Sequence, residues 1–217
     1  MRPILFNTEM VRAILSGQKT VTRRVVKPQP TNPRWNQIGW LGWDDGHGRK
    51  MRQPYTTGDI LYVRETWAVH PCPGKEYFKL SVDTLCEHSD AEHGCFLYKA
   101  TGYDTLCGTT TAPHKWRPSI HMPREAARIF LRVTGVRVER LQDISECEAK
   151  REGAVLPPEA ASDPEYADYI GGYYSAFGEL WDSTIKPADR AVYGWAANPW
   201  VWVIEFDRCE KPDECGN

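Results

Sequence analysis

The order of strand-like and helix-like stretches is the feature that most limits what this chain can fold into. Runs of apolar and β-branched residues that are typical of strands occur towards both ends and at intervals between, at 3–6, 20–26, 60–67, 96–100, 129–138 and 199–206. The regular alternation of strand and helix that builds a doubly wound parallel sheet is missing. The sequence therefore predicts an α+β fold, a small mixed β-barrel with short flanking helices and long inserted loops.

Two short stretches carry the start and stop signals of helices. The first has Thr8 as its predicted N-cap and ends at Gly17. The second begins with Ser145 and Glu148, whose spacing is that of a capping box, and it places Glu152 in its last turn. A longer apolar face with a spacing of three to four residues predicts a third helix over 164–181.

Two long stretches, at about 31–57 and 70–113, have neither helical nor strand periodicity. We interpret both as irregular insertions in one domain that spans residues 1–217. A chain of 217 residues with 41% apolar content is long enough to bury one full core without disulfides.

Composition narrows the class of protein. With 27 basic and 29 acidic residues the net charge is −2, which excludes the strongly basic signature of a protein that coats nucleic acid but leaves room for local basic patches. Seven irregularly spaced cysteines and the lack of an apolar leader predict reduced thiols in the cytoplasm. The longest apolar run, 200–204, is far below the about 18 residues of a membrane span. The oligomeric state is not indicated.

The segment 17–24 places a lysine, two threonines and two arginines directly behind the first predicted helix. A threonine hydroxyl becomes a nucleophile only when a base takes its proton, and a lysine serves as that base only where burial or nearby cations lower its pKa. Arg23 and Arg24 would supply such cations beside Lys19. From composition alone, the segment could equally be a solvated basic turn that leads into a strand.

Several segments, in their content and order, resemble the ASCH domain, which belongs to the PUA-like β-barrel superfamily. They are Gly17-Gln18-Lys19-Thr20-Val21-Thr22-Arg23, the strand after Gly58-Asp59, the helix over 144–153 and the closing strand over 202–206. The stretches 115–123, 174–181 and 198–200 are similar to the longer phage and prophage members of the family.

The resemblance implies a role linked to RNA or nucleosides, since PUA-like domains commonly recognise modified RNA. A small bacterial member is an N4-acetylcytidine amidohydrolase, and its lysine, threonine and glutamate fall on Lys19, Thr22 and Glu152. Thr22 would attack the acyl carbonyl and Glu152 would protonate the departing amine, with no catalytic cofactor. Because other members are ribonucleases or have no assigned activity, non-catalytic RNA binding and RNA cleavage in the same cleft remain alternatives.

Other side chains offer contacts to a modified nucleoside or to single-stranded RNA, the two expected partners. The linker 115–123 mixes cations, hydroxyls and an aromatic ring, as single-stranded RNA sites do, although its prolines are equally typical of a structural crossover. Glu65 is a second candidate carboxylate, or a charge-paired strand residue with Arg64. The candidate binding residues are Arg23, Arg24, Glu65, Trp67, Trp116, Arg117, Ser119 and His121.

A cysteine and histidine pattern in the second irregular stretch predicts a structural zinc site. Cys86 and His88 form one pair and His93 and Cys95 form its mirror image, and thiolate plus imidazole is a ligand set suited to zinc. The spacing within each pair is narrower than in the common structural zinc sites. A polar loop with reduced cysteines is the alternative.

Overall fold

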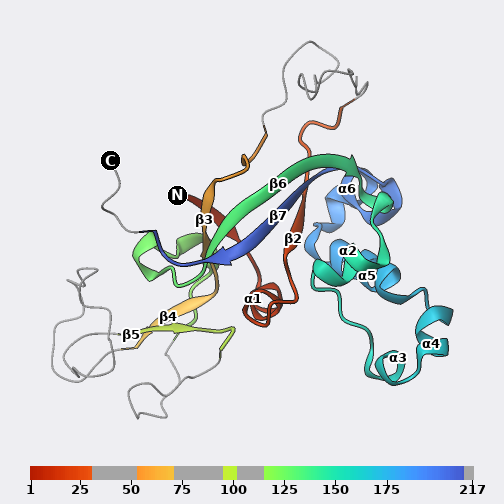
Figure 1. Cartoon of the computed structure of the whole chain (residues 1–217), viewed down its shortest axis with the longest axis horizontal. Coiled ribbons are helices and arrows are strands. Elements are labelled where there is room, and N and C mark those ends of the chain that lie inside the picture. The colour runs from red at the N-terminus through yellow and green to blue at the C-terminus, as the bar shows by residue number, and fades with distance from the viewer. Residues whose placement is uncertain (31–52, 71–94, 102–114, 213–217) are drawn as a thin grey trace. The chain divides into compact units, whose positions relative to one another are not determined.

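The computed structural model describes residues 1–30, 53–70, 95–101 and 115–212 (Figure 1). The chain divides into two compact units, each of which is discontinuous in sequence. The first contains Met1–Ser16, Ile60–Leu131 and Arg208–Asn217, and the second contains Gly17–Asp59 and Arg132–Asp207. The single-domain interpretation stays a prediction.

The first unit is built from short strands and one helix. Its strand β1 pairs in parallel with β3, and β4 pairs antiparallel with β5. In the same sheet as β1, β3 lies beside β6, whose first residues belong to this unit. The elements are β1 (Arg2–Leu5), α1 (Thr8–Leu15), β3 (Ile60–Arg64), β4 (Trp67–His70), β5 (Cys95–Tyr98), the 3-10 turns η2 (Ser119–His121) and η3 (Arg124–Ala126), and the first residues of β6 (Phe130–Arg140).

Two sequence predictions in this unit need correction. The N-cap of α1 is Asn7, whose side chain accepts the Met10 N–H at 2.8 Å, and Thr8 is already the first helical residue. The strand predicted over 60–67 is two strands, because the chain leaves β3 after Arg64 and starts β4 at Trp67.

The second unit places β2 beside β7 and β7 beside β6, with helices against them. The β2 and β7 strands are antiparallel, with Arg23 opposite Val203. The elements are β2 (Val21–Val25), most of β6, the 3-10 turns η4 (Leu141–Asp143), η5 (Pro187–Asp189) and η6 (Trp195–Ala197), the helices α2 (Glu146–Arg151), α3 (Pro158–Ser162), α4 (Pro164–Tyr169), α5 (Gly172–Thr184) and α6 (Arg190–Tyr193), and most of β7 (Trp200–Cys209).

The core of the second unit lies between the strands and the helices α2 and α5. Alternate residues of β2 and β7 point to one face, and from that face Val21, Val201 and Val203 pack against apolar side chains of the helical side. Phe177 and Trp181, one turn apart on α5, are 2% and 6% exposed. The sequence thus buries one face of the strands beneath two helices that also position the polar residues described below.

The helix predicted over 164–181 is broken in two. Gly171 and Gly172 have φ angles of 79° and 56°, a left-handed conformation that side-chain-bearing residues rarely adopt, and they end α4 and start α5. The prediction of an α+β fold with short helices is confirmed. In neither unit do the described strands close into a barrel. None of the helices in the described part of the chain is long and apolar enough to cross a membrane.

Candidate functional site

The helix α2 begins at the capping box that its sequence predicts and ends at a glycine. Ser145 Oγ accepts the Glu148 N–H at 3.3 Å, and Glu148 Oε2 accepts the Ser145 N–H at 3.2 Å, which confirms the capping box. Gly153, with a φ of 90°, ends the helix. Glu152 therefore occupies the C-cap position, where it is 3% exposed.

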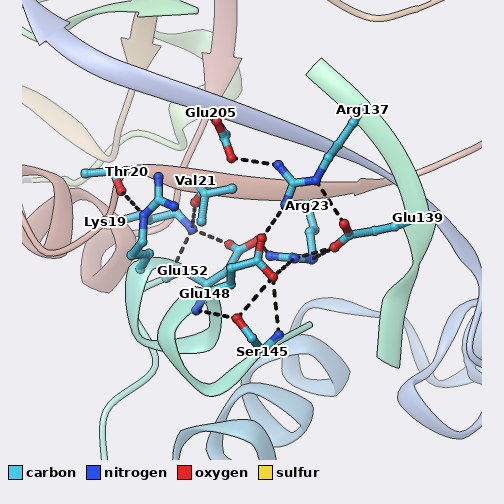
Figure 2. Close-up of polar contacts among 11 residues, drawn as sticks. Lys19, Thr20, Val21, Arg23, Arg137, Glu139, Ser145, Glu148, Glu152 and Glu205 are labelled. Carbon is cyan, nitrogen blue, oxygen red and sulfur yellow. Dashed lines mark hydrogen bonds and ion pairs between the residues drawn. The ribbon is translucent and has the colours of Figure 1, made fainter. Parts of the chain in front are cut away.

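Lys19 reaches Glu152 across 133 positions of sequence (Figure 2). Its Nζ donates to Glu152 Oε2 at 2.6 Å, to the Glu152 carbonyl at 2.6 Å and to the Val21 carbonyl at 2.8 Å. A lysine ammonium has three N–H donors, so each one has an acceptor. Both side chains are almost completely buried, with exposed fractions of 0% and 4%.

Arg23 holds the second oxygen of the same carboxylate. Its Nη1 donates to Glu152 Oε1 at 3.1 Å, while its Nε donates to Glu139 Oε1 at 3.1 Å and its Nη2 contacts Glu139 and Glu148. The guanidinium also lies over the Phe177 ring, 5.9 Å from its centroid. Two cations from one short segment thus fix both oxygens of Glu152.

Arg137 ties the outer carboxylates together. It donates from Nε to Glu139 Oε2 at 3.0 Å, from Nη1 to Glu205 Oε1 at 2.6 Å and from Nη2 to Glu148 (Figure 2). A Cβ at Gly135 would lie 3.3 Å from Glu205 Oε2, so a larger residue there would crowd this carboxylate. Four carboxylates and three cations form the network among the described residues.

Burial and charge shift the pKa values of Lys19, Glu148 and Arg137, and the shifts at the first two bear on the chemistry of the site. Burial lowers the pKa of the Lys19 ammonium, and Arg24 and Arg23 push in the same direction, whereas Glu152 opposes the shift. Burial alone would raise the pKa of Glu148, but the Ser145 N–H and the charges of Arg23 and Arg137 leave it lowered. Charge partners and the Ser145 N–H thus favour an ionised Glu148, whereas burial weakens proton binding at Lys19.

Thr22 lies apart from this pair. Neighbouring residues of a strand point to opposite faces, so Thr22 and Arg24 project away from the side on which Arg23 meets Glu152. Thr22 is 2% exposed, and within the described residues no hydrogen bond joins its hydroxyl to Lys19 or Glu152. Two members of the predicted catalytic set are in contact, and the predicted nucleophile is not.

The candidate residues of the first unit have structural partners of their own. Glu65 is 1% exposed and accepts two hydrogen bonds from Arg128, at 3.0 and 3.1 Å. The charge pair considered for Glu65 therefore exists with Arg128 and not with Arg64, whose Nε donates to the Met122 carbonyl. Tyr98, under Arg128, has its pKa raised to about 12 by burial.

The predicted RNA-contacting linker pairs with β4. Trp67 and Arg117 exchange backbone hydrogen bonds, and the Arg117 guanidinium lies 5.0 Å from the centre of the Trp67 ring. Ser119 and His121 lie on η2, where His121 is exposed and Ser119 is partly buried, and Trp116 is also partly buried. These residues share the first unit with Glu65, whereas Lys19, Arg23, Arg24 and Glu152 belong to the second.

Several members of the network were missed in the sequence. Arg137 and Glu139 are two residues apart in a strand, so they share a face, and this spacing was the available signal. Glu205 carries no local signal, because its partner comes from another segment, and the same holds for Arg128, the partner of Glu65 in the first unit. Glu148 was recognised only for its capping role.

The predicted zinc ligands Cys86, His88 and His93 lie outside the described residues, and of Cys95 only the backbone, at the start of β5, is described. In the described part of the chain, no group of three or more histidine, cysteine, aspartate or glutamate side chains could hold a metal ion. The zinc site stays a prediction.

The chain was compared with known proteins, and no protein-family model, no curated protein and no solved structure matches it.

Proposed function

We propose that the second unit is an amidohydrolase site that removes the acyl group from an N4-acetylcytidine-like nucleoside, with Lys19, Thr22 and Glu152 as its working residues. The observation that carries the proposal is the buried contact of 2.6 Å between Lys19 Nζ and Glu152 Oε2. Such a pair is weak evidence for a stabilising role, because removing two charges from water can cost as much as their attraction returns.

The pair provides both proton transfers that amide cleavage needs. Moving one proton from Lys19 Nζ to Glu152 Oε2 leaves a neutral amine, which is a base, and a carboxylic acid, which is a proton donor. The lowered pKa of Lys19, caused first by burial, makes its ammonium easier to deprotonate.

The reaction then follows in a defined order. Thr22 Oγ attacks the acyl carbonyl carbon as the amine takes its proton, and Glu152 donates a proton to N4 as the C–N bond breaks. Water releases the acyl group from Thr22. Catalytic hydrogen bonds are often completed only when substrate is bound. Because Thr22 projects from the other face of β2, its approach to Lys19 would require a local change in the backbone of that strand.

The fold, the family and the cellular compartment that we propose with this activity rest on the sequence. We place the chain among the longer phage and prophage ASCH proteins, which have a PUA-like fold. Its irregular cysteines fit a reducing compartment such as the cytoplasm. The proposed partners are a modified nucleoside or single-stranded RNA.

One observation favours a different class, a non-catalytic reader of RNA or a ribonuclease acting at the same residues. Every Lys19 donor has an acceptor, and Thr22 has no hydrogen bond to Lys19 or Glu152 within the described residues. A reader that neutralises several phosphates binds less tightly as salt rises, whereas turnover of a neutral nucleoside hardly responds to salt.

The test is release of cytidine from N4-acetylcytidine by the wild-type protein and by Thr22→Ala. We expect the substitution to lower the rate at least about 100-fold, because it removes the nucleophile. Thr20→Ala is the matched control: it removes a neighbouring hydroxyl, one that accepts from Arg151 at 2.9 Å. If the wild-type protein releases no cytidine but binds RNA in a salt-sensitive way, the result supports the non-catalytic reader. If it releases no cytidine but cleaves RNA, the result supports the ribonuclease.

A further inference from the structure

Two arginines and two glutamates of the second unit form a closed ring of ion pairs. Glu139 and Glu148 each accept from Arg23 on one carboxylate oxygen and from Arg137 on the other (Figure 2). The Arg23 side chain has an exposed fraction of 0%, whereas that of Arg137 is 39% exposed. The buried cation of the ring is the one that contacts Glu152.

Glu139 fixes the direction in which Arg23 points. Its Oε1 accepts from Arg23 Nε at 3.1 Å and also from Nη2, so one edge of the guanidinium lies against this oxygen. Because the guanidinium is planar and rigid, an edge held at Nε and Nη2 directs Nη1 away from Glu139. Arg23 Nη1 donates to Glu152 Oε1 at 3.1 Å, which leaves Oε2 to Lys19.

The contacts of Glu139 all belong to this ring. In the described part of the chain, the partners of its carboxylate are the two arginines. Glu148, by contrast, also caps α2 through Ser145. Arg137 lies two positions before Glu139 on the same face of β6, and its Nε donates to Glu139 Oε2 at 3.0 Å. The strand therefore supplies both a carboxylate for Arg23 and a cation that holds this carboxylate.

The charge of Glu139 also bears on the proton that Lys19 and Glu152 share. The charged groups that act on this pair, directly or through the ring, are Arg23, Arg24, Arg137, Glu139, Glu148 and Glu205. A buried arginine with no carboxylate to offset it would hold Glu152 in its ionised form and resist proton transfer from Lys19. Because Glu139 offsets this charge, Arg23 can orient Glu152 while Glu152 still accepts a proton.

We propose that Glu139 is a positioning residue of the hydrolytic site. Through Arg23 it holds Glu152 Oε1 in place, and it offsets the Arg23 charge so that Glu152 can take the proton of Lys19. This role rests on the proposed function and adds to it a residue outside the set of Lys19, Thr22 and Glu152.

The first test is the pH profile of kcat for cytidine release from N4-acetylcytidine by wild type and Glu139→Gln. Glutamine keeps the shape of the side chain and an acceptor oxygen for Arg23, but it removes the charge. The active pair holds one proton between its two members, and with one negative charge fewer nearby it takes up and loses protons at lower pH. We expect the profile to move to lower pH by at least about 0.5 of a pH unit, with KM unchanged. A purely structural role would lower kcat without moving the profile.

Glu205→Gln is the matched comparison, because it removes the same charge from the same network at a residue that contacts Arg137 instead of Arg23. We expect it to move the profile by less than half as much as Glu139→Gln. An equal shift in the two variants would show that Glu139 has no special role and would overturn the proposal.

Glu139→Ala separates orientation from charge, because it also removes the oxygen that holds Arg23. At the pH optimum of each variant, kcat of Glu139→Ala should be about 10-fold below that of Glu139→Gln, since a misplaced catalytic group loses rate steeply. Equal values of kcat in the two variants would contradict the orienting role.

A second measurement does not depend on turnover. Burial is the largest cause of the lowered Lys19 pKa, and Arg24 and Arg23 add to it against the effect of Glu152. In Glu139→Gln, where Arg23 is less offset, the Lys19 side chain should therefore lose its proton at a lower pH than in wild type, as followed by NMR of labelled lysine. An unchanged Lys19 titration would overturn the role of Glu139 alone, whereas a wild-type protein that releases no cytidine would overturn the hydrolytic function itself.

Discussion

At Glu152, two cations fix the two oxygens of one buried carboxylate, and this decides which variants are informative. Taking Lys19 away leaves Glu152 with Arg23 alone, and breaking a buried pair costs about 3–5 kcal/mol. A Lys19 variant would therefore mix loss of activity with loss of folding. Thr22, outside the pair, allows the chemistry to be tested with less disturbance of the network.

Glu148 makes the stability of the second unit depend on pH. Its pKa lies below the ordinary 4.5 in the folded protein, so the folded state holds the ionised form more strongly than the unfolded chain does. The stabilisation is complete above the unfolded pKa and is lost as the pH falls through the folded pKa. Between about pH 5 and about pH 3, Glu148→Gln should flatten the fall of the urea midpoint.

Glutamine keeps the capping box, since either residue serves at that position, so Glu148→Gln isolates the ion pairs with Arg23 and Arg137. Glu159→Gln, at an exposed position on α3, is the control and should leave the pH dependence unchanged. A wild-type pH dependence in Glu148→Gln would show that the network does not control acid stability.

At the scale of elements, α2 caps α5. The N-cap residue of α5 is Gly171, which has no side chain, and Glu146 of α2 takes over by accepting the N–H groups of Tyr173 at 2.8 Å and Tyr174 at 3.0 Å. Capping carboxylates stabilise helix starts through hydrogen bonds and the helix dipole. Because α5 carries Phe177 against Arg23, this cap also supports the site.

Glu146→Ala should lower the free energy of unfolding by about 1–2 kcal/mol, the range measured for lost N-caps. The measurement is urea unfolding followed by circular dichroism. The control is Glu179→Ala, an exposed position on α5, the helix that Glu146 caps. If the two variants were equally stable, the contacts of Glu146 would not act as a cap.

Elements with strong local signals were predictable. The capping box at Ser145 depends on residues three apart, and the left-handed Gly17 ends its helix as expected. The break at Gly171 was underestimated because the apolar spacing continues across it. The short helices α3 and α6 have too few residues to set up a period.

At the scale of the whole molecule, composition does not say which charges are available. A net charge of −2 hides a network in which Lys19, Arg23 and Arg137 are committed to carboxylates. In the part of the chain that the structure describes, Lys27 and Arg140 lie over aromatic rings instead. The contact of Lys19 with Glu152 was expected only through a family resemblance. Periodicity describes single elements, whereas this site is assembled from β2 and the residues before it, β6, β7 and α2.

The central claim is that the Lys19 and Glu152 pair carries out amide hydrolysis. The most direct test is the rate of cytidine release from N4-acetylcytidine by Glu152→Gln and by wild type, at a temperature where circular dichroism shows both to be folded. Glutamine preserves the shape of the side chain but cannot give up the proton, so we predict a rate at least about 100-fold lower in the variant. A wild-type rate in Glu152→Gln, or no cytidine from the wild-type protein, would contradict the claim.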